Sequence, residues 1–564
     1  MQTVRRLYVY LLSGISLGVL AYGLIVLLDA IFGQLGIGQG TLIGRDGDNW
    51  ARQQLSLAAA LIGVGLPVWG IHWWFAERGL QTDRPNAEDE RASVVRALYL
   101  TVVLVVLLGF GAFAARDLVR EAVLGILPRP SADFYYGNAN PAMSLASLLV
   151  AAAAWGYHVA IRRRDMARGP LHEAAAWIPR VYVYGVTLVA LSVTLQAFGD
   201  LARYAGETVW TPANNPEDSY RSYAFADSLS TVAVWAGAWL GHWWYIGTLT
   251  NAGDWRATSE SGARLRLAFF MAVILSGSLS VVRLAGEALR AILVPVFGAI
   301  DAIGGNLDGT DLLRTVAVAL VSAVPWAVAW WLHQRRMHEE ALQADDPART
   351  VVATRLGLHA VALVGLAFAA VGSGWLFGLL IDVLLAGSRT VGASGFWRAE
   401  LATFVPYAVL GLLVWVWRWW PIQSLHATDP AGEASSTIRR SFLLIILAAS
   451  VLVTLGSLAL VLYRLFGLLL GAGLGGDTIS ELSTPVGALL AAGTVAVYHG
   501  LALRRDLSLR AEAAPVAITE PPSTAPAGAE RFALVLRGPS EGDLAAAVDA
   551  LRAALPPGFT LDEG

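Results

Sequence analysis

Residues 6–29 read RLYVYLLSGISLGVLAYGLIVLLD, an uncharged and mostly apolar run between an arginine and an aspartate. A run of this length can cross the hydrocarbon core of a bilayer as a helix, which takes about 20 apolar residues. A signal peptide has a shorter apolar core and a small-residue cleavage site, and this segment has neither. We therefore expect a first membrane helix that stays attached.

The remainder of the chain repeats this pattern. Of its 564 residues, 56% are hydrophobic and 15% are charged, and the mean hydropathy is +0.56. Ordinary soluble domains are about 45–50% apolar and about 25% charged, so the composition predicts an all-α polytopic membrane protein. Apolar runs predict twelve transmembrane helices, at about 7–29, 54–76, 97–117, 142–162, 181–201, 227–249, 266–290, 313–334, 356–384, 401–421, 441–467 and 484–503.

Two absences from the composition exclude classes of chemistry. The chain has no cysteine, which excludes disulfides and cysteine-ligated metal or iron–sulfur sites. All 40 basic residues are arginine, which excludes Schiff-base lysines and P-loop lysines. A net charge of −3 gives no indication of a nucleic-acid partner.

Arginines are concentrated in the loops on one side of the predicted membrane segments. That side carries Arg5, Arg6, the run Arg162–Arg164, Arg335 and Arg336 among others, whereas the opposite loops carry few basic residues. An excess of arginine marks the cytoplasmic side of a membrane protein. We expect both termini to be cytoplasmic, in the inner membrane of a bacterium.

Two landmarks recur with one period along the chain. The second helix of each predicted pair ends in a histidine or arginine, at His72, His158, His242, His333, Arg418 and His499. In the first five copies a tryptophan stands three positions before this residue. The first helix of each pair opens with an arginine, at Arg6, Arg96, Arg180, Arg264, Arg355 and Arg439. The spacings are 86, 84, 91, 85 and 81 residues for the first landmark, and 90, 84, 84, 91 and 84 for the second. A shared period of this kind predicts six copies of a two-helix hairpin, all facing the same way across the membrane.

The landmarks divide the chain into repeats and a tail. The predicted repeats are 1–95, 96–179, 180–263, 264–354, 355–438 and 439–510. Residues 511–528 are rich in alanine and proline and read as a linker. Residues 529–564 form a small tail module, for which the pattern predicts strands at 532–536 and 559–561 and a helix from Ser540 to Leu555.

The opening phrase Arg5-Arg6-Leu7-Tyr8-Val9-Tyr10 returns in the third repeat as Pro179-Arg180-Val181-Tyr182-Val183-Tyr184. This phrase resembles the start of a bacterial integral-membrane domain family of unknown function. The resemblance implies a membrane location and repeated helix pairs, and it supplies no catalytic residues.

The six repeat-equivalent positions, at His72, His158, His242, His333, Arg418 and His499, are the candidate site. In the leading interpretation they are structural, anchoring helix ends in the aromatic belt at the cytoplasmic interface. Alternatively, they form a ring of titratable groups along a pore, or some of them ligate a haem. Neither a metal nor another cofactor is expected. A second set of charged residues marks the other end of the first helices, at Asp29, Asp117, Asp200, Glu287 and Asp382, with Arg464 in the sixth copy.

The sequence leaves three classes of function open. A non-enzymatic membrane scaffold, or a subunit of a membrane complex, is favoured because few ionisable groups stand at mid-membrane. A transporter or channel with a permeation path between the repeats is the alternative. An enzyme is not expected, because the chain has no catalytic motif. The expected partners are the lipid bilayer, other membrane-complex subunits or a second copy of the chain.

Overall fold

The computed structural model of the chain describes residues 2–37, 47–81, 87–127, 140–169, 173–210, 218–251, 253, 260, 264–300, 309–343, 347–386, 396–470, 478–513 and 541–555. Twelve long helices account for most of them. They are α1 (Gln2–Gln34), α2 (Gly47–Arg78), α4 (Val94–Leu124), α5 (Pro141–Ala167), α6 (Glu173–Trp210), α7 (Asp218–Thr250), α9 (Arg264–Val296), α10 (Gly309–Gln343), α11 (Pro347–Ala386), α13 (Phe396–Thr428), α15 (Thr437–Leu469) and α16 (Thr478–Ala513). The described residues contain no strand, and the prediction of an all-α polytopic fold is confirmed.

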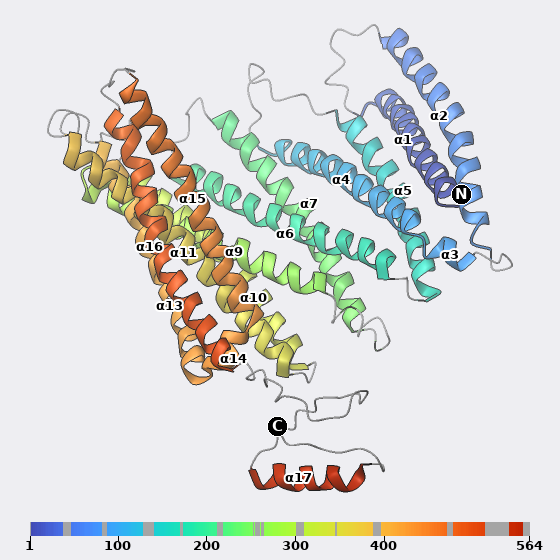
Figure 1. Cartoon of the computed structure of the whole chain (residues 1–564). Coiled ribbons are helices and arrows are strands. Elements are labelled where there is room, and N and C mark those ends of the chain that lie inside the picture. The colour runs from blue at the N-terminus through green and yellow to red at the C-terminus, as the bar shows by residue number, and fades with distance from the viewer. Residues whose placement is uncertain are drawn as a thin grey trace.

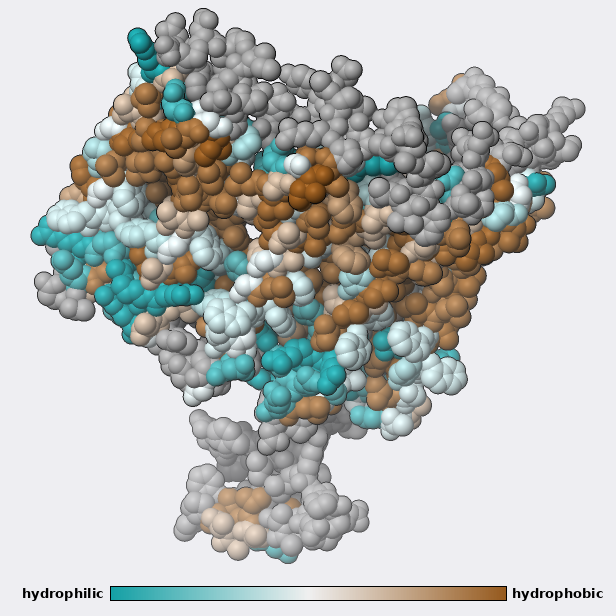
Figure 2. Space-filling view, turned by 180° about the vertical axis from the view of Figure 1, so that it is seen from behind, coloured by the Kyte–Doolittle hydropathy of each residue, from teal (hydrophilic) through white to brown (hydrophobic). Residues whose placement is uncertain are grey.

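Within the described residues, eleven helices are long and apolar enough to cross a membrane. The twelfth predicted span corresponds to α7, which has the length of a membrane helix at 33 residues. It falls short in hydropathy because four tryptophans and a histidine replace aliphatic side chains in its second half. Tryptophan and histidine are tolerated at membrane interfaces, so we retain α7 as a spanning helix. Figure 2 shows hydrophobic side chains over the flanks of the bundle.

Short helices occupy two of the links between hairpins, and one further helix lies in the tail. These are α3 (Ala87–Arg91), α14 (Pro430–Ser435) and α17 (Glu541–Ala554). The bounds of α17 match the helix predicted in the tail. The predicted strands at 532–536 and 559–561 lie outside the described residues. Helix α16 continues to Ala513 and so enters the segment predicted to be a linker.

The six hairpins associate in pairs, which the sequence landmarks did not indicate. Unit 1 contains α1, α2, α4 and α5; unit 2 contains α6, α7, α9 and α10; unit 3 contains α11, α13, α15 and α16. In every unit the first helix packs against the second and also against the fourth. The three units are therefore equivalent four-helix assemblies.

The units follow one another as an open row (Figure 1). The third helix of one unit packs on the first two helices of the next, so that α4 contacts α6 and α7, and α9 contacts α11 and α13. Helices α1 and α2 stand at one end of the row, and α15 and α16 stand at the other. The repeats therefore extend along a line in the membrane, each contacting its neighbours, as in a solenoid.

Helix contacts in unit 3 are made backbone to backbone through glycine. Gly487 of α16 lies so close to α11 that a Cβ atom there would overlap backbone atoms of Gly374 and Gly378. On the other side of α11, a Cβ at Gly411 of α13 would overlap the backbone of Ala369. Small residues permit this approach, which drives helix association where lipid removes the hydrophobic advantage of burial.

Gly487→Ala is expected to separate α11 from α16 and to lower stability by about 1–3 kcal/mol, the usual effect of overpacking. The matched control is Gly493→Ala in the same helix, where an added Cβ meets no atom within 4 Å. Thermal unfolding of both variants in one detergent measures the difference. Equal melting temperatures for the two variants would contradict the close packing of these helices.

Candidate functional site

Each histidine of the candidate set is held by its own helix. In every copy the Nδ1–H donates to the backbone carbonyl four residues earlier: His72 to Val68 at 2.7 Å, His158 to Ala154 at 2.7 Å, His242 to Ala238 at 2.8 Å, His333 to Ala329 at 2.7 Å and His499 to Val495 at 2.9 Å. Since a carbonyl can only accept, the neutral ring carries its proton on Nδ1. The Nε2 atom is thereby left as an acceptor that faces the neighbouring helices.

The partner of Nε2 depends on one residue near the start of the neighbouring helix. Tyr99, three residues after Arg96, donates its hydroxyl to His158 over 3.2 Å. Phe269 and Phe442 hold the equivalent places after Arg266 and Arg439. Accordingly, Nε2 of His333 and of His499 has no hydrogen-bond partner within the described residues.

The second hairpin of each unit buries its histidine among aromatic rings. His158, His333 and His499 are 0%, 4% and 1% exposed. Each contacts the tryptophan that follows the equivalent position of the preceding hairpin: Trp73 lies 5.7 Å from His158, Trp243 lies 5.0 Å from His333 and Trp419 lies 5.5 Å from His499, centroid to centroid. These three histidines are therefore buried between helices, and their own helices continue beyond them to Ala167, Gln343 and Ala513, so the expected position at the helix ends is wrong.

The first-hairpin positions are less deeply buried and differ from one another. His242 accepts a 3.0 Å hydrogen bond from Tyr182, and half-buried His72 meets the ring of Tyr8 at 5.6 Å. In the third unit Gly357 stands where the other units have these tyrosines, and Arg418 replaces the histidine. The Arg418 guanidinium lies 3.6 Å from the centroid of Trp417 and 6.0 Å from that of Trp330.

A buried ionic cluster beside His158 joins all four helices of unit 1. Arg96, which is 1% exposed at the start of α4, donates to Asp165 of α5 at 2.8 Å and to Glu77 of α2 at 2.9 Å. Its third contact is the hydroxyl of Tyr10 in α1 at 3.1 Å, and this hydroxyl donates to Glu90 of α3 at 3.4 Å. Arg6 closes the cluster with a 2.8 Å bond to the same glutamate.

Unit 2 reproduces the cluster with equivalent residues. Arg266 binds Glu340 of α10 at 2.7 Å and the hydroxyl of Tyr184 at 3.0 Å. Tyr184 in turn donates to Glu260 at 2.6 Å, and Arg180 binds that glutamate at 3.1 Å.

Unit 3 keeps the arginines and carboxylates but lacks the bridging hydroxyl. Arg439 binds Asp506 of α16 at 2.8 Å, and Arg355 binds Glu433 of α14 at 2.8 Å. His359 stands where the other units have Tyr10 and Tyr184, and it bonds to its own helix through Nδ1. As a result, Nη1 of Arg439 is buried with no hydrogen-bond partner in the described structure.

Fixed spacings in the sequence accompany this cluster, although the repeat landmarks did not draw attention to them. A glutamate stands six residues before the central arginine in each unit, at Glu90, Glu260 and Glu433. A carboxylate stands seven residues after the second histidine, at Asp165, Glu340 and Asp506. The structure also corrects one landmark, because Arg266 and not Arg264 makes the contacts equivalent to those of Arg96 and Arg439.

These clusters define a basic end of the row, at the first residues of the first and third helices and the last turns of the second and fourth. Each central arginine is neutralised by carboxylates from other helices. A buried pair of this kind is costly to break, because the remaining charge is left without compensation. The arrangement is suited to a structural role: it holds the two helices of the second hairpin together at the basic end, and in units 1 and 2 a tyrosine hydroxyl connects them to the first hairpin.

The acidic residues predicted at the opposite end are paired in four of five cases. Asp117 binds Arg120 at 3.0 Å, Asp200 binds Arg203 at 3.6 Å, Glu287 binds Arg283, and Asp29 accepts from Asn140 at 3.1 Å. The exception is Asp382, whose buried Oδ1 has no hydrogen-bond partner among the described residues. Most of these charges therefore serve contacts within or between neighbouring helices.

Polar contacts at this opposite end also join successive units. Arg120 of α4 bonds to Asp227 of α7 at 3.3 Å. The equivalent pair between units 2 and 3 is Arg290 of α9 with Thr403 of α13 at 3.0 Å. In both joints the arginine lies 24 residues after the central arginine of its unit.

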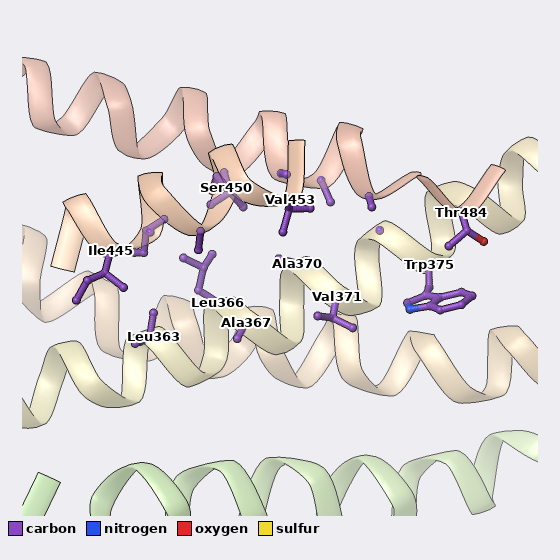
Figure 3. Close-up of a pocket in the computed structure, with 17 residues that line it drawn as sticks. Leu363, Leu366, Ala367, Ala370, Val371, Trp375, Ile445, Ser450, Val453 and Thr484 are labelled. Carbon is purple, nitrogen blue, oxygen red and sulfur yellow. The ribbon is translucent and has the colours of Figure 1, made fainter. Parts of the chain in front are cut away.

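Two apolar cavities lie beside the contact between the first and fourth helices, one in unit 3 and one in unit 1. One, of about 330 Å³, lies between α11, α15 and α16, where the side chains of Leu366, Val371 and Val453 point into it (Figure 3). The other, of about 410 Å³, lies between α1, α2 and α5 and is lined mostly by leucine and alanine. The third helix completes the cavity of unit 3 and the second helix completes that of unit 1, so the two cavities do not correspond.

A polar hollow of about 330 Å³ opens between α6, α9 and α10 at the opposite end. Its charged lining residues are Asp200, Arg203, Arg283, Glu287 and Arg314. Every arginine here has an acidic partner in its own helix, including Arg314 with Asp311 at 3.0 Å. The charges of the hollow are balanced.

The family comparison matches more than half of the chain. The model described as Domain of unknown function (DUF5671) matches residues 6–127, 101–215 and 355–494. The third match runs from α11 through α13 and α15 into α16, so one copy of this domain spans parts of all four helices of unit 3. No curated protein and no solved structure matches the chain.

Within the described residues, no group of three or more histidine, aspartate or glutamate side chains is placed to hold a metal ion. The haem alternative stays a prediction. Its candidate ligands, Nε2 of His333 and of His499, face the aromatic rings of Phe269 and Phe442 at centroid distances of 5.6 and 6.3 Å.

Arg439→Gln is expected to destabilise the protein by about 3–5 kcal/mol, because it leaves the buried carboxylate of Asp506 without its partner. Arg440→Gln is the matched control: its side chain is exposed, and a change of about 0.5 kcal/mol or less is expected. The double variant Arg439→Gln/Asp506→Asn should recover part of the loss. Chemical denaturation in detergent tests the series, and equal effects of the two single variants would refute the role of the cluster.

Proposed function

The chain belongs to the family defined by the domain of unknown function DUF5671, and on this premise we propose that it is a non-enzymatic membrane scaffold or a subunit of a membrane complex. The observation that carries the proposal is the threefold ionic cluster at the basic end. It uses the buried arginines and carboxylates of each unit to hold helices together. A scaffold needs this rigidity and no further chemistry.

The distribution of charge along the spanning helices supports the same proposal. Residues 7–28, 97–115, 181–199 and 441–463 contain no aspartate, glutamate, arginine or histidine. Secondary transporters hold their substrates and coupling ions near the bilayer midplane, often with ionisable side chains. Helices α1, α4, α6 and α15 therefore offer no such group over these stretches.

A transporter or channel is the second candidate, and the polar hollow between α6, α9 and α10 favours it. A vestibule of this kind at one end of the helices would be the entrance to a permeation path. Below the charged residues, its lining includes Leu195, Leu284 and Trp326, which are apolar. A continuous polar route would need these side chains to move apart.

We further propose that the basic end faces the cytoplasm of a bacterium and that both termini lie there. The basis is the excess of arginine in the loops of that end. A second copy of the chain or other membrane-complex subunits are the partners that this proposal requires, besides the bilayer itself.

Because the chain has no cysteine, single-cysteine variants give an unambiguous orientation. Gln34→Cys lies at the opposite end of α1 and Ala167→Cys at the basic end of α5, and both positions are exposed. In intact spheroplasts, an impermeant maleimide is expected to label Gln34→Cys and to label Ala167→Cys only after permeabilisation. The reverse pattern would invert the orientation.

The scaffold and transport proposals separate in reconstituted liposomes. A scaffold is expected to release K⁺, Na⁺, H⁺ or Cl⁻ no faster than protein-free liposomes do. In mildly solubilised native membranes it should migrate in an assembly larger than one chain of 60.0 kDa with its detergent. A pH-dependent flux that disappears in His242→Gln, with thermal stability unchanged, would establish the transport alternative and overturn the scaffold.

A further inference from the structure

A cavity of about 310 Å³ lies at the basic end, where unit 1 meets unit 2. Arg162 and Arg163, near the end of α5, provide its charge, and its aromatic lining comes from Trp155, Tyr182 and Tyr245 among others. On α7 the lining residues include Gly237 and Gly241, which are exposed and have no atom within 4 Å of a built Cβ. The cavity therefore combines a cationic mouth with an open groove along a helix.

The lining of this cavity supplies no negative charge. None of its lining residues is acidic, and the described structure gives Arg162 and Arg163 no carboxylate partner. The third arginine of the run, Arg164, differs because it binds Glu77 at 2.7 Å and Asp165 at 3.1 Å. Two of three consecutive arginines are thus excluded from the ionic cluster of unit 1.

Arg162 is positioned by its neighbours although it forms no ion pair in the described structure, since Glu260, which attracts it, is bound by Arg180. Its guanidinium lies 5.2 Å from the centroid of the Tyr182 ring and donates to the backbone carbonyl of Pro179 at 3.3 Å. Its Nε is buried and has no hydrogen-bond partner in the described residues. A cation held in place with an unused donor is suited to an anion that enters the cavity.

The equivalent boundary between units 2 and 3 also holds an uncompensated arginine. There the residue is Arg418 of α13, which faces Trp330, the counterpart of Trp155. Its Nε is likewise buried without a partner among the described residues. A positive charge is therefore kept at both boundaries, although different helices supply it.

We propose that the cavity between units 1 and 2 binds the headgroup phosphate of an anionic phospholipid. Arg162 and Arg163 contact the phosphate, and an acyl chain lies along the groove at Gly237 and Gly241. Basic pockets between membrane helices are suited to anionic lipid headgroups, and the apolar groove accounts for the orientation of the ligand. A lipid bound there would fill the cavity between the two units, and its phosphate would supply the negative charge that the lining lacks.

The test compares phosphatidylglycerol with phosphatidylcholine on the full chain in detergent. Native mass spectrometry is expected to show one retained phosphatidylglycerol and no selective retention of phosphatidylcholine. Arg162→Gln/Arg163→Gln should weaken phosphatidylglycerol binding by about 30-fold, which corresponds to about 2 kcal/mol for two arginines. The matched control is Arg504→Gln/Arg505→Gln, which removes an adjacent, exposed arginine pair of α16 outside the cavity and should leave binding unchanged.

Gly241→Leu is a second variant that keeps both arginines but fills the groove, and it should also reduce phosphatidylglycerol binding. Because an added Cβ meets no atom there, the variant is expected to fold. Equal retention of both lipids, or equal loss in the two double-arginine variants, would overturn the proposal. Binding of inorganic phosphate as strong as that of phosphatidylglycerol would also overturn the proposal, since the site would then recognise the free anion.

Discussion

A guanidinium buried at the start of a membrane helix has to be neutralised by groups that the protein itself supplies. Arg96, Arg266 and Arg439 occupy this place in the three units, and each is 3% exposed or less. In every unit a carboxylate near the end of the other helix of the same hairpin neutralises the arginine: Asp165, Glu340 or Asp506. In units 1 and 2 the hydroxyl of Tyr10 or Tyr184 connects the arginine to the first hairpin, and in unit 1 Glu77 adds a second carboxylate. Satisfying one charge therefore fixes how the two helices of the second hairpin align, and the tyrosine bridges of units 1 and 2 bring the first hairpin to the same point.

The contacts between successive units involve fewer charged pairs than the clusters within units, and their chemistry differs from one boundary to the other. Arg120 meets Asp227 in the first joint, whereas Arg290 meets a threonine hydroxyl in the second. At the two ends of the row the equivalent positions are Tyr463 and Leu57, which are 69% and 40% exposed. Terminal repeats of a linear array usually carry an altered outer face, and in a bilayer an apolar or aromatic face suits lipid.

This architecture places rigidity and uncompensated charge in different parts of the molecule. Inside each unit the arginines are bound to carboxylates, and the proposed scaffold depends on that stiffness. At the boundaries Arg162 and Arg418 have no acidic partner in the described structure, so the bilayer can influence how successive units meet. A scaffold whose units are rigid and whose joints respond to lipid could adapt to its partners without opening a unit.

Composition and periodicity determined the class of fold. In lipid, the backbone N–H and C=O groups of a long uncharged run have to be hydrogen-bonded within the protein, and a helix satisfies them within the run itself. The recurrence of Trp and His at one spacing also determined the hairpin repeats, because duplicated segments preserve local landmarks. The pairing of hairpins was beyond that reasoning, although Glu90 stands six residues before Arg96 just as Glu433 stands before Arg439. Only the tertiary structure decided that these groups meet, because a sequence spacing of about 70–85 residues between partners gives no direction in space. It decided for the same reason that His158 and His499 are interior residues, since burial depends on which neighbouring helix covers a given stretch of a helix.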